Sequence, residues 1–459
     1  MELLLTVGKD RPGTLSAQIE GQFRAAIRDG SLRPGTAVPS TRDLAGELRV
    51  SRKVVVDAYA QLAAEGYLAM RQGAQPRVAP GPFGAVAGAG DVPVAARTRY
   101  DFRPSRPDVS SFPRAAWSRC LRDAVTDITV ADLGYGDAFG VDELRDGLAD
   151  YLGRVRGVVA EPGRVVVTNG YLQGLNLVCR ALVARGARRI AMEDPCSSED
   201  PVIAARAGLE VVRVPVDADG MRVDLLAGSG AGAVALTPAH QSPTGVVLSA
   251  ERRAALVAWL RAHDAIAIED DYDAEYRYDR PAVGSLQGLD GDHVIYAGTA
   301  SKVLAPALRL GWLVVPGALT AALRAEKLLA DQGTARIEQL AFARFLRRGD
   351  LDRHLRRMRV RYRSRRDATI AALAGALPAA TVRGIAAGLH VTVELPAGHD
   401  ERAIRAAAAD RGIAIGVLGD YRSTVDGTPT LILGYSQMSE SRLRAGIHEL
   451  ADLITRAAP

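Results

Sequence analysis

Hydrophobic positions recur every four residues near the start of the chain. Ile19, Phe23 and Ile27 lie on one face of a predicted helix that ends at a glycine and an Arg-Pro-Gly turn. Two further short helices are expected, because Ser40 and Ser51 each stand where a hydroxyl group can cap a helix N-terminus. Two capped helices separated by a few residues predict a helix-turn-helix.

The remainder of the chain alternates β-branched apolar runs with amphipathic segments rich in Ala, Leu and Arg. For example, RVVVTNG precedes YLQGLNLVCRALVARG, and AIAIEDD follows SAERRAALVAWLRAHD. This alternation predicts a parallel sheet flanked by helices. The stretch between the two patterns is crowded with Gly, Ala and Pro and lacks periodicity, which is typical of a linker. We therefore expect a first domain at 1–79, a flexible linker at 80–98 and a large domain at 99–459.

Composition and charge narrow the class of protein. With 459 residues, 48% hydrophobic and 24% charged, the chain has the composition of a globular protein and the length for at least two cores. Its formal net charge of +5 is mild. The three cysteines lack metal-ligand spacing, so we expect reduced thiols and no metal site. No segment reaches the ~20 apolar residues of a membrane helix, and no signal peptide is evident, so a cytoplasmic location is predicted.

The second helix of the predicted helix-turn-helix has a basic, polar start. Its core positions are predicted to be Val55, Ala58 and Leu62. Arg52, Lys53 and Tyr59 would then point outward, and cations and hydroxyls suit the phosphates and base edges of a major groove. The alternative is a small helical bundle with a solvated basic face.

Three strand ends in the large domain converge on one chemical task. The run VVVTNG ends at Gly170 and opens a helix, whose free N–H groups and dipole can hold a phosphate. AIAIEDDY delivers Asp270 and Tyr272 from the carboxyl end of a buried strand, where open α/β sheets place ligands. HVIYAGTASK ends in Lys302, and Arg309 follows seven positions later.

This combination matches the requirements of pyridoxal 5'-phosphate (PLP). The cofactor needs a Schiff-base lysine, a carboxylate that keeps the ring nitrogen protonated, a phenol for the ring O3' and an arginine for the phosphate. We assign these roles to Lys302, Asp270, Tyr272 and Arg309 respectively. The residues expected to complete the cofactor site are Thr299, Ser301, Gly170, Tyr171 and Leu172. Taken singly, each of these residues is more typical of an ordinary loop or helix start.

Segments of the two predicted domains resemble two known families. LRPGTAVPSTRDLAGELRVSRKVVVDAYAQLAAEGYL, followed by MRQGAQPRV, resembles the winged helix-turn-helix of the GntR family. YGDAFGVDELRDGLADYL, TPAHQSPTG, EDDYDAEY and GTASKVLAPALRLGW resemble fold-type I aminotransferases. Together they have the layout of the MocR subfamily of bacterial transcription regulators. The resemblance implies a mostly α winged helix with a small β wing, joined to an α/β PLP-binding domain with a smaller C-terminal α+β subdomain.

The resemblance also implies partners and roles. It implies a head-to-tail homodimer that binds double-stranded operator DNA and whose large domain usually senses a ligand rather than turning over substrate. The DNA contacts it carries over are Ser40, Thr41, Arg42, Ser51, Arg52 and Lys53, with Arg71, Gln72 and Gly73 at the wing tip.

Three pocket positions depart from the aminotransferase pattern. Ile432 stands where an arginine usually grips the substrate carboxylate, and Glu199 stands where some amino-acid-sensing members have another. Ser197 replaces an aromatic ring that stacks on the cofactor, while Arg422 is an alternative carboxylate grip on a predicted loop. These departures weaken the case for an ordinary α-amino acid as ligand. Our hypothesis is that PLP itself is the effector and that the targets are vitamin B6 metabolism genes, as the resemblance to the vitamin B6-regulating branch of this family implies. The alternatives are an active aminotransferase with an accessory DNA-binding module, and a large domain kept for dimerisation alone.

Overall fold

The computed structural model describes residues 5–71, 74–80, 98–279, 283–424 and 427–456. The chain forms two compact units, Met1–Ala95 and Ala96–Pro459. Most of the predicted linker, 80–98, lies outside the described residues. No helix in the described ranges is long and apolar enough to cross a membrane.

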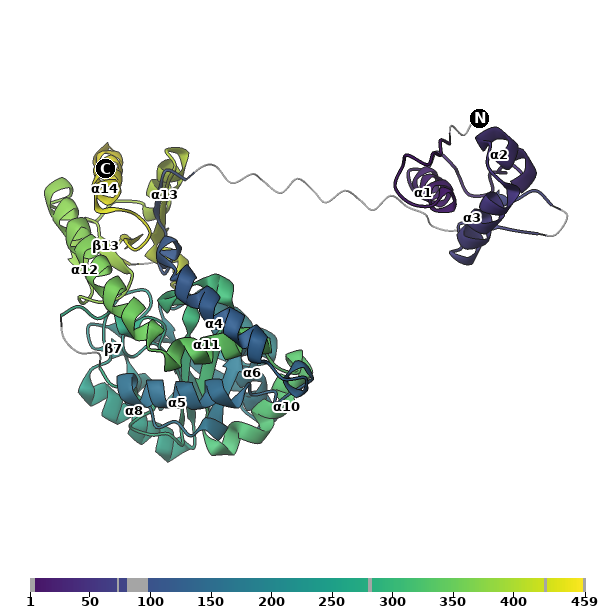
Figure 1. Ribbon diagram of the computed structural model, residues 1–459. Coiled ribbons are helices and arrows are strands. Elements are labelled where there is room, and N and C mark those ends of the chain that lie inside the picture. Colours follow the sequence, from purple (N-terminus) through teal and green to yellow (C-terminus); the bar gives the residue numbers. More distant parts are fainter. Residues whose placement is uncertain (1–4, 72–73, 81–97, 280–282, 425–426, 457–459) are drawn as a thin grey trace. The chain divides into compact units, whose positions relative to one another are not determined.

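The N-terminal unit has three helices and a hairpin among its described residues (Figure 1). They are α1 (Leu15–Arg28), α2 (Thr41–Leu48), α3 (Arg52–Ala64), β1 (Leu68–Ala69) and β2 (Arg77–Val78), with β1 and β2 antiparallel. As predicted, α1 buries its four-residue repeat, and Ser40 caps α2 by accepting from the backbone N–H of Asp43. Ser51 occupies the cap position of α3 without making a side-chain cap bond.

Tyr59 belongs to the core of this unit, so the prediction that it faces DNA is wrong. Its side chain is fully buried, its hydroxyl donates to the carbonyl oxygen of Pro39 at 2.9 Å, and its ring meets Phe23 edge-on at 5.5 Å. The reason is helical spacing: Tyr59 lies four positions after Val55 and three before Leu62, on the same apolar face.

A large sheet organises the second unit. Among the described residues it contains, in spatial order, β4 (Val165–Thr168), β11 (Gly311–Val314), β10 (Val294–Thr299), β9 (Ile266–Asp270), β8 (Ala233–Leu236), β5 (Arg189–Asp194), β6 (Glu210–Asp217) and β7 (Gly220–Met221). The neighbours from β10 through β6 are parallel, as expected. Strand β11 runs antiparallel to both β10 and β4, because the eleven residues between Thr299 and Gly311 are too few for a crossover helix.

Helices cover this sheet, and one apolar cluster lies between the sheet and α6 (Figure 1). The helices of this part are α4 (Arg114–Asp127), α5 (Asp142–Arg156), α6 (Tyr171–Ala184), α7 (Glu199–Ala207), α8 (Ala250–His263), α9 (Ala300–Val303), α10 (Thr320–Asp331) and α11 (Arg336–Arg347). The strands are apolar along most of their length, as expected for a sheet buried on both faces. Polar side chains are therefore concentrated at strand ends.

A smaller sheet forms the C-terminal subdomain. Its order is β12 (Thr381–Arg383), β13 (His390–Glu394), β15 (Thr430–Gly434), β14 (Ile413–Val417) and β3 (Tyr100–Phe102). The helices of this subdomain are α12 (Asp350–Ala376), α13 (Glu401–Asp410) and α14 (Glu440–Arg456). Because β3 pairs in parallel with β14, the segment that follows the linker is anchored in this subdomain. The observed architecture confirms the predicted fold class.

Candidate cofactor pocket and DNA-binding surface

A cavity of about 400 Å³ opens at the carboxyl ends of the large sheet's strands. Strands β5, β8, β9 and β10 all contribute lining residues at or near those ends. The lining includes these residues of the predicted cofactor set: Tyr171, Leu172, Asp270, Tyr272, Thr299, Ser301, Lys302 and Arg309. Gly170 lies just outside the lining, at the start of α6. The topology thus brings together side chains spread over 138 positions, from Tyr171 to Arg309.

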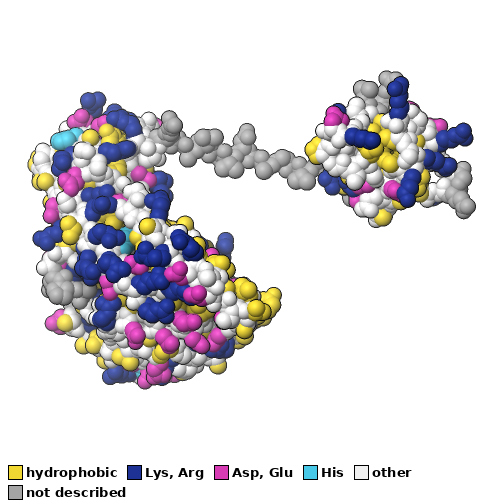
Figure 2. Space-filling view, in the orientation of Figure 1, with side chains coloured by type: hydrophobic (Ala, Val, Ile, Leu, Met, Phe, Trp, Pro, Cys, Tyr) yellow, Lys and Arg dark blue, Asp and Glu magenta, His cyan; other side chains and the backbone are white. Residues whose placement is uncertain are grey.

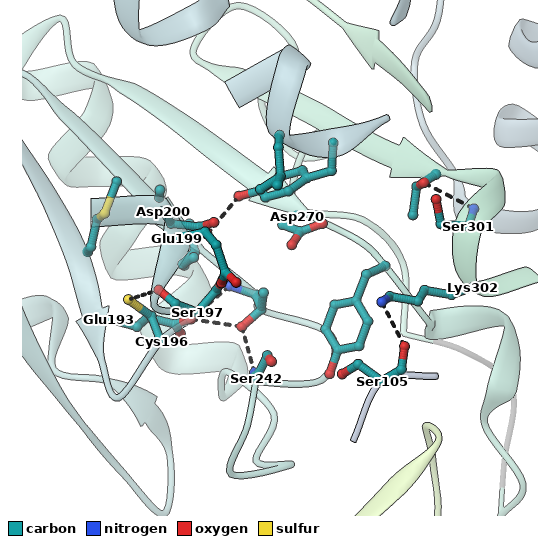
Figure 3. A pocket seen from close by; sticks show the side chains of 18 of the residues that line it. Ser105, Glu193, Cys196, Ser197, Glu199, Asp200, Ser242, Asp270, Ser301 and Lys302 are labelled. Carbon is teal, nitrogen blue, oxygen red and sulfur yellow. Dashed lines mark hydrogen bonds between the residues drawn. The ribbon is translucent and has the colours of Figure 1, made fainter. Parts of the chain in front are cut away.

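Lys302 projects into this cavity from the short helix α9. Its Nζ donates to the carbonyl oxygen of Ser105 at 2.7 Å (Figure 3). Burial lowers the pKa of the Lys302 amine, although the carboxylates of Asp270 and Asp273 oppose this shift. A lowered pKa increases the fraction of neutral amine, which is the nucleophilic form.

Asp270 ends strand β9 and faces the same cavity (Figure 3). Its Oδ1 is buried and has no hydrogen-bond partner. Burial raises the pKa of this carboxyl well above its ordinary value, and Asp200 and Asp271 raise it further. A buried carboxyl oxygen without a partner is costly, so an N–H donor bound in the cavity would relieve the penalty.

Asp271 points away from the cavity and fixes the end of the strand. Its Oδ2 accepts hydrogen bonds from Arg156 Nε at 2.6 Å and from the Tyr296 hydroxyl at 2.7 Å. Its backbone N–H donates to the carbonyl of Ala297 on β10. Because consecutive side chains on a strand alternate in direction, this buried network orients Asp270 toward the cavity.

Tyr272 is held by groups that the sequence patterns did not identify. Its hydroxyl lies 3.1 Å from His240 Nδ1, and the same nitrogen lies 3.1 Å from each carboxylate oxygen of Asp273. Burial raises the pKa of Tyr272 well above its ordinary value, so the phenol remains protonated and can donate to a ligand oxygen.

The end of the cavity near Arg309 is built around the start of α6. Arg309 donates from Nη2 to the carbonyl oxygen of Asn169 at 2.5 Å. Gly170 has a φ of 87°, and a Cβ there would come within 3.3 Å of the Arg309 guanidinium. The glycine therefore lets a cation lie against a helix N-terminus, where both favour an anion. Thr299 Oγ1 accepts from the backbone N–H of Ser301 nearby, at 3.1 Å.

Sequence reasoning missed two buried acidic residues of the cavity, Asp200 and Glu193. Asp200 accepts a hydrogen bond from the Tyr171 hydroxyl at 3.1 Å, and burial raises the pKa of Asp200 to about 6. Burial raises the pKa of Glu193 to about 7, although Thr237 and Gln241 donate to its Oε2. The available signal was EDPCSSED, which begins with the last two residues of β5 and so lies at a strand's carboxyl end.

The positions that depart from the aminotransferase pattern differ in whether they line the cavity. Ser197 and Glu199 line the cavity. Ile432 is fully buried in β15, and Arg422 contacts the carbonyl of Thr428 at 3.4 Å; neither lines the cavity. Among the described lining residues, the cations are therefore Lys302 and Arg309.

The predicted DNA contacts lie around the starts of α2 and α3. Arg42, Ser51, Arg52, Lys53 and Arg71 are exposed, and Ser40 and Thr41 are half-buried. Arg52 Nε lies 3.4 Å from Thr41 Oγ1, which joins the two helix starts into one surface. Gln72 and Gly73 lie outside the described residues.

Each of the two units matches a known protein family. The model of bacterial regulatory proteins of the gntR family matches residues 15–78, and that of aminotransferase class I and II matches residues 114–420. The chain is 31% identical to the "HTH-type pyridoxine biosynthesis transcriptional regulator PdxR" of Corynebacterium glutamicum, covering 99% of each chain. It is 31% identical to the "Probable rhizopine catabolism regulatory protein MocR" of Rhizobium meliloti, covering 97% of this chain and 95% of that one.

Among solved structures, an archaeal alanine:glyoxylate aminotransferase superposes with a TM-score of 0.71 at 27% identity, covering 79% of this chain and 91% of that one. A winged helix-turn-helix and an aminotransferase-type pocket on one chain define a class of DNA-binding transcription regulators. This chain belongs to the MocR subfamily of the GntR regulators, whose aminotransferase-like domain is of a PLP-dependent fold family.

Proposed function

We propose that this regulator binds PLP in the cavity and that occupancy of the cavity controls operator binding. The observation that carries the proposal is the unpartnered, buried Oδ1 of Asp270 in the same cavity as the Lys302 amine. A domain kept only for dimerisation would not need an unpartnered carboxyl group beside a buried lysine, since both cost stability.

The residues of the cavity fit the cofactor group by group. Bound PLP supplies an aldehyde for reaction with amines and an electron-withdrawing ring. Lys302 provides the amine, Asp270 holds a proton at the ring nitrogen and Tyr272 donates to the ring oxygen. The phosphate would be held by Arg309, by the N–H groups of α6 and by nearby hydroxyls. The further members of this proposed set are Thr299, Ser301, Gly170, Tyr171 and Leu172.

The proposed role is sensing without physiological turnover. A transaminase that acts on amino acids has to hold a carboxylate, and a lost charge-assisted hydrogen bond costs roughly 1.5–3 kcal/mol. The two cations among the described lining residues, Lys302 and Arg309, are both assigned to the cofactor. Glu199 would moreover repel a substrate carboxylate.

PLP itself is the proposed effector, and genes of vitamin B6 metabolism are the proposed targets. The support is the full-length likeness to a protein named as a pyridoxine biosynthesis regulator. Under this proposal the cofactor favours one of two arrangements of the regulator, and its differential affinity sets the size of the shift. Operator binding would place the protein in the cytoplasm, with the chromosome.

A head-to-tail homodimer is the proposed assembly. Large apolar side chains gather at one end of the second unit, beside the end of α4 and along α10 (Figure 2). The most exposed are Val130 at 89%, Tyr135 at 92% and Leu329 at 81%, and Leu133 and Leu328 belong to the same group. Exposed apolar patches of this kind are typical of protein interfaces. Sedimentation of the protein as a monomer at micromolar concentration would contradict this assembly.

Operator DNA is proposed to contact the surface formed by the starts of α2 and α3 and by the wing. The assigned residues are Ser40, Thr41, Arg42, Ser51, Arg52, Lys53, Arg71, Gln72 and Gly73. Hydroxyls and cations at helix N-termini suit phosphates, and side chains from α3 can reach base edges.

The test is a DNA-binding titration with and without PLP. The operator is first selected from random duplexes with the full-length protein. We expect PLP to change the operator Kd of the native protein severalfold and to leave that of Lys302→Ala unchanged. An identical Kd with and without PLP, in a protein that demonstrably holds PLP, would overturn the effector role.

A further inference from the structure

Two carboxyl groups of the cavity have no role in the proposed cofactor site. The acidic residues among the described lining residues are Glu193, Glu199, Asp200 and Asp270. Asp270 is assigned to the cofactor ring, and Glu193 already accepts hydrogen bonds from Thr237 and Gln241. Glu199 and Asp200 remain, side by side at the start of α7, across the cavity from Lys302 in Figure 3.

Acidic residues in the first turn of a helix often do no more than complement the helix dipole. Asp200 departs from that explanation because it is 9% exposed, and its Oδ1 has no hydrogen-bond partner while the side chain lines the cavity. Arg213, a cation close enough to Asp200 to act on it, donates instead to Cys196 Sγ at 2.7 Å and to the Glu193 carbonyl at 3.3 Å. The Oδ1 atom of Asp200 therefore has no hydrogen-bond donor, while Oδ2 accepts from the Tyr171 hydroxyl.

Glu199, next to Asp200, supplies a negative charge that is complementary to a cationic ligand. The Ser197 hydroxyl donates to its Oε2 at 2.8 Å, and this bond lowers the pKa of the Glu199 carboxyl. The group is therefore ionised at neutral pH. One anion and one unpartnered carboxyl oxygen at the same wall form a site for a group with several N–H donors and a positive charge, which describes an ammonium.

We propose that the wall formed by Glu199 and Asp200 binds the ammonium group of a small aliphatic amine that carries no acid group, with a diamine as the best-fitting class. This inference rests on the proposed function, because the amine would be a second effector beside the cofactor. A diamine presents one nitrogen to this wall and carries no acid group at its other end. An amino acid of the same length would place its carboxylate where both cations of the described lining, Lys302 and Arg309, are already assigned to the cofactor.

Isothermal titration of the full-length, PLP-loaded protein tests the amine site. The probes are putrescine and γ-aminobutyrate, which has the same chain length but a carboxylate in place of one ammonium. We expect putrescine to bind about tenfold or more tightly, because a charge-assisted hydrogen bond is replaced by repulsion. Equal or tighter binding of γ-aminobutyrate would overturn the proposal.

Charge-changing variants localise the effect. Glu199→Gln keeps the shape of an exposed side chain, and we expect it to weaken putrescine about tenfold. Asp200→Asn should act in the same direction, and Glu199→Arg should reverse the preference toward γ-aminobutyrate. Unchanged putrescine affinity in both Glu199→Gln and Asp200→Asn would also overturn the site.

The failure of the amine site can be told apart from the failure of the cofactor role. Lys302-dependent PLP retention is measured in the same samples by absorption after gel filtration. Loss of retention in the native protein would contradict the cofactor role, while the effect of Glu199→Gln on putrescine affinity without PLP still tests the wall. Retained PLP with no preference for putrescine would contradict the amine site alone.

Discussion

Lys302 Nζ lies 2.7 Å from the carbonyl oxygen of Ser105, a serine held at a φ of 59°. Non-glycine residues seldom adopt this left-handed backbone, so the surrounding structure must hold the carbonyl against the amine. The contact positions the amine at the cavity and occupies one of its hydrogens. It marks Lys302 as a lysine with a defined resting place rather than a mobile surface side chain.

The first prediction is that PLP can be attached by reduction to Lys302 selectively. When PLP is added and the protein is reduced with borohydride, we expect the label on Lys302 and not on Lys327. Burial lowers the pKa of both amines, which makes Lys327 a matched control. Lys327, however, is fully buried and bonded to Asp331 at 2.7 Å and Thr334 at 2.9 Å, away from the cavity. Peptide mapping by mass spectrometry gives the answer, and equal labelling in Lys302→Ala would refute it.

The second prediction concerns the DNA surface. We expect Arg52→Ala and Lys53→Ala each to weaken binding to all duplexes similarly, and each to reduce the salt dependence of binding by about one phosphate contact. Fluorescence anisotropy over a series of salt concentrations measures both quantities. The control is Arg24→Ala, which removes the same charge from a side chain that is paired with Glu65 at 2.6 Å. Salt slopes indistinguishable from that control would contradict the assigned surface.

The third prediction follows from the corrected position of Tyr59. Tyr59→Phe removes the 2.9 Å hydrogen bond to Pro39, so we expect a loss of about 0.5–1.5 kcal/mol in stability with no change in operator affinity. Tyr59→Ala also empties a core site and should cost about 3–5 kcal/mol. Chemical unfolding of the N-terminal unit, followed by near-ultraviolet circular dichroism, measures both. A DNA-binding defect in a fully folded Tyr59→Phe protein would restore a contact role.

Periodicity predicted the parts of the fold that local spacing determines. The core faces of α1 and α3 follow from repeats of three and four residues, and the strand-end rule placed Asp270, Thr299 and Lys302 at one edge of the sheet. The outward prediction for Tyr59 is wrong because helical spacing, and not the polar hydroxyl, determines the face on which this side chain lies. The alternation of strands and helices did not predict that β11 is antiparallel, because this pattern does not indicate the direction of a strand that follows a short connection.

Other features depend on tertiary contacts that no local pattern contains. Ser105 meets Lys302 across 197 positions of sequence, and His240 meets Tyr272 across 32. Asp200 looks like an ordinary helix-start acid until its burial against the cavity is known. Such residues become functional candidates through desolvation and missing partners, and both are properties of the folded chain.

The fourth prediction is that the free energy of unfolding depends on pH through Glu275, a buried residue outside the cavity lining. Burial raises the pKa of Glu275 to about 7, and Asp271 raises it further while Arg156 lowers it. The folded state then binds a proton that the unfolded state has released, from the ordinary value of 4.5 up to about 7. Stability from this group is therefore fully present below pH 4.5 and is lost as the pH rises through 7.

Glu275→Gln isolates this contribution, because the amide oxygen can still accept the 3.2 Å hydrogen bond from Tyr151. Two buried histidines act in the opposite sense below neutrality, since burial lowers the pKa of His354 and His390 to about 4. Their effect is common to both proteins and cancels in the difference. We expect the variant to be more stable than the native protein by on the order of 1–3 kcal/mol at pH 8, and the advantage to vanish near pH 5. Urea unfolding of the large unit at both pH values measures the difference, and an advantage that does not change with pH would show that Glu275 keeps the same charge in both states.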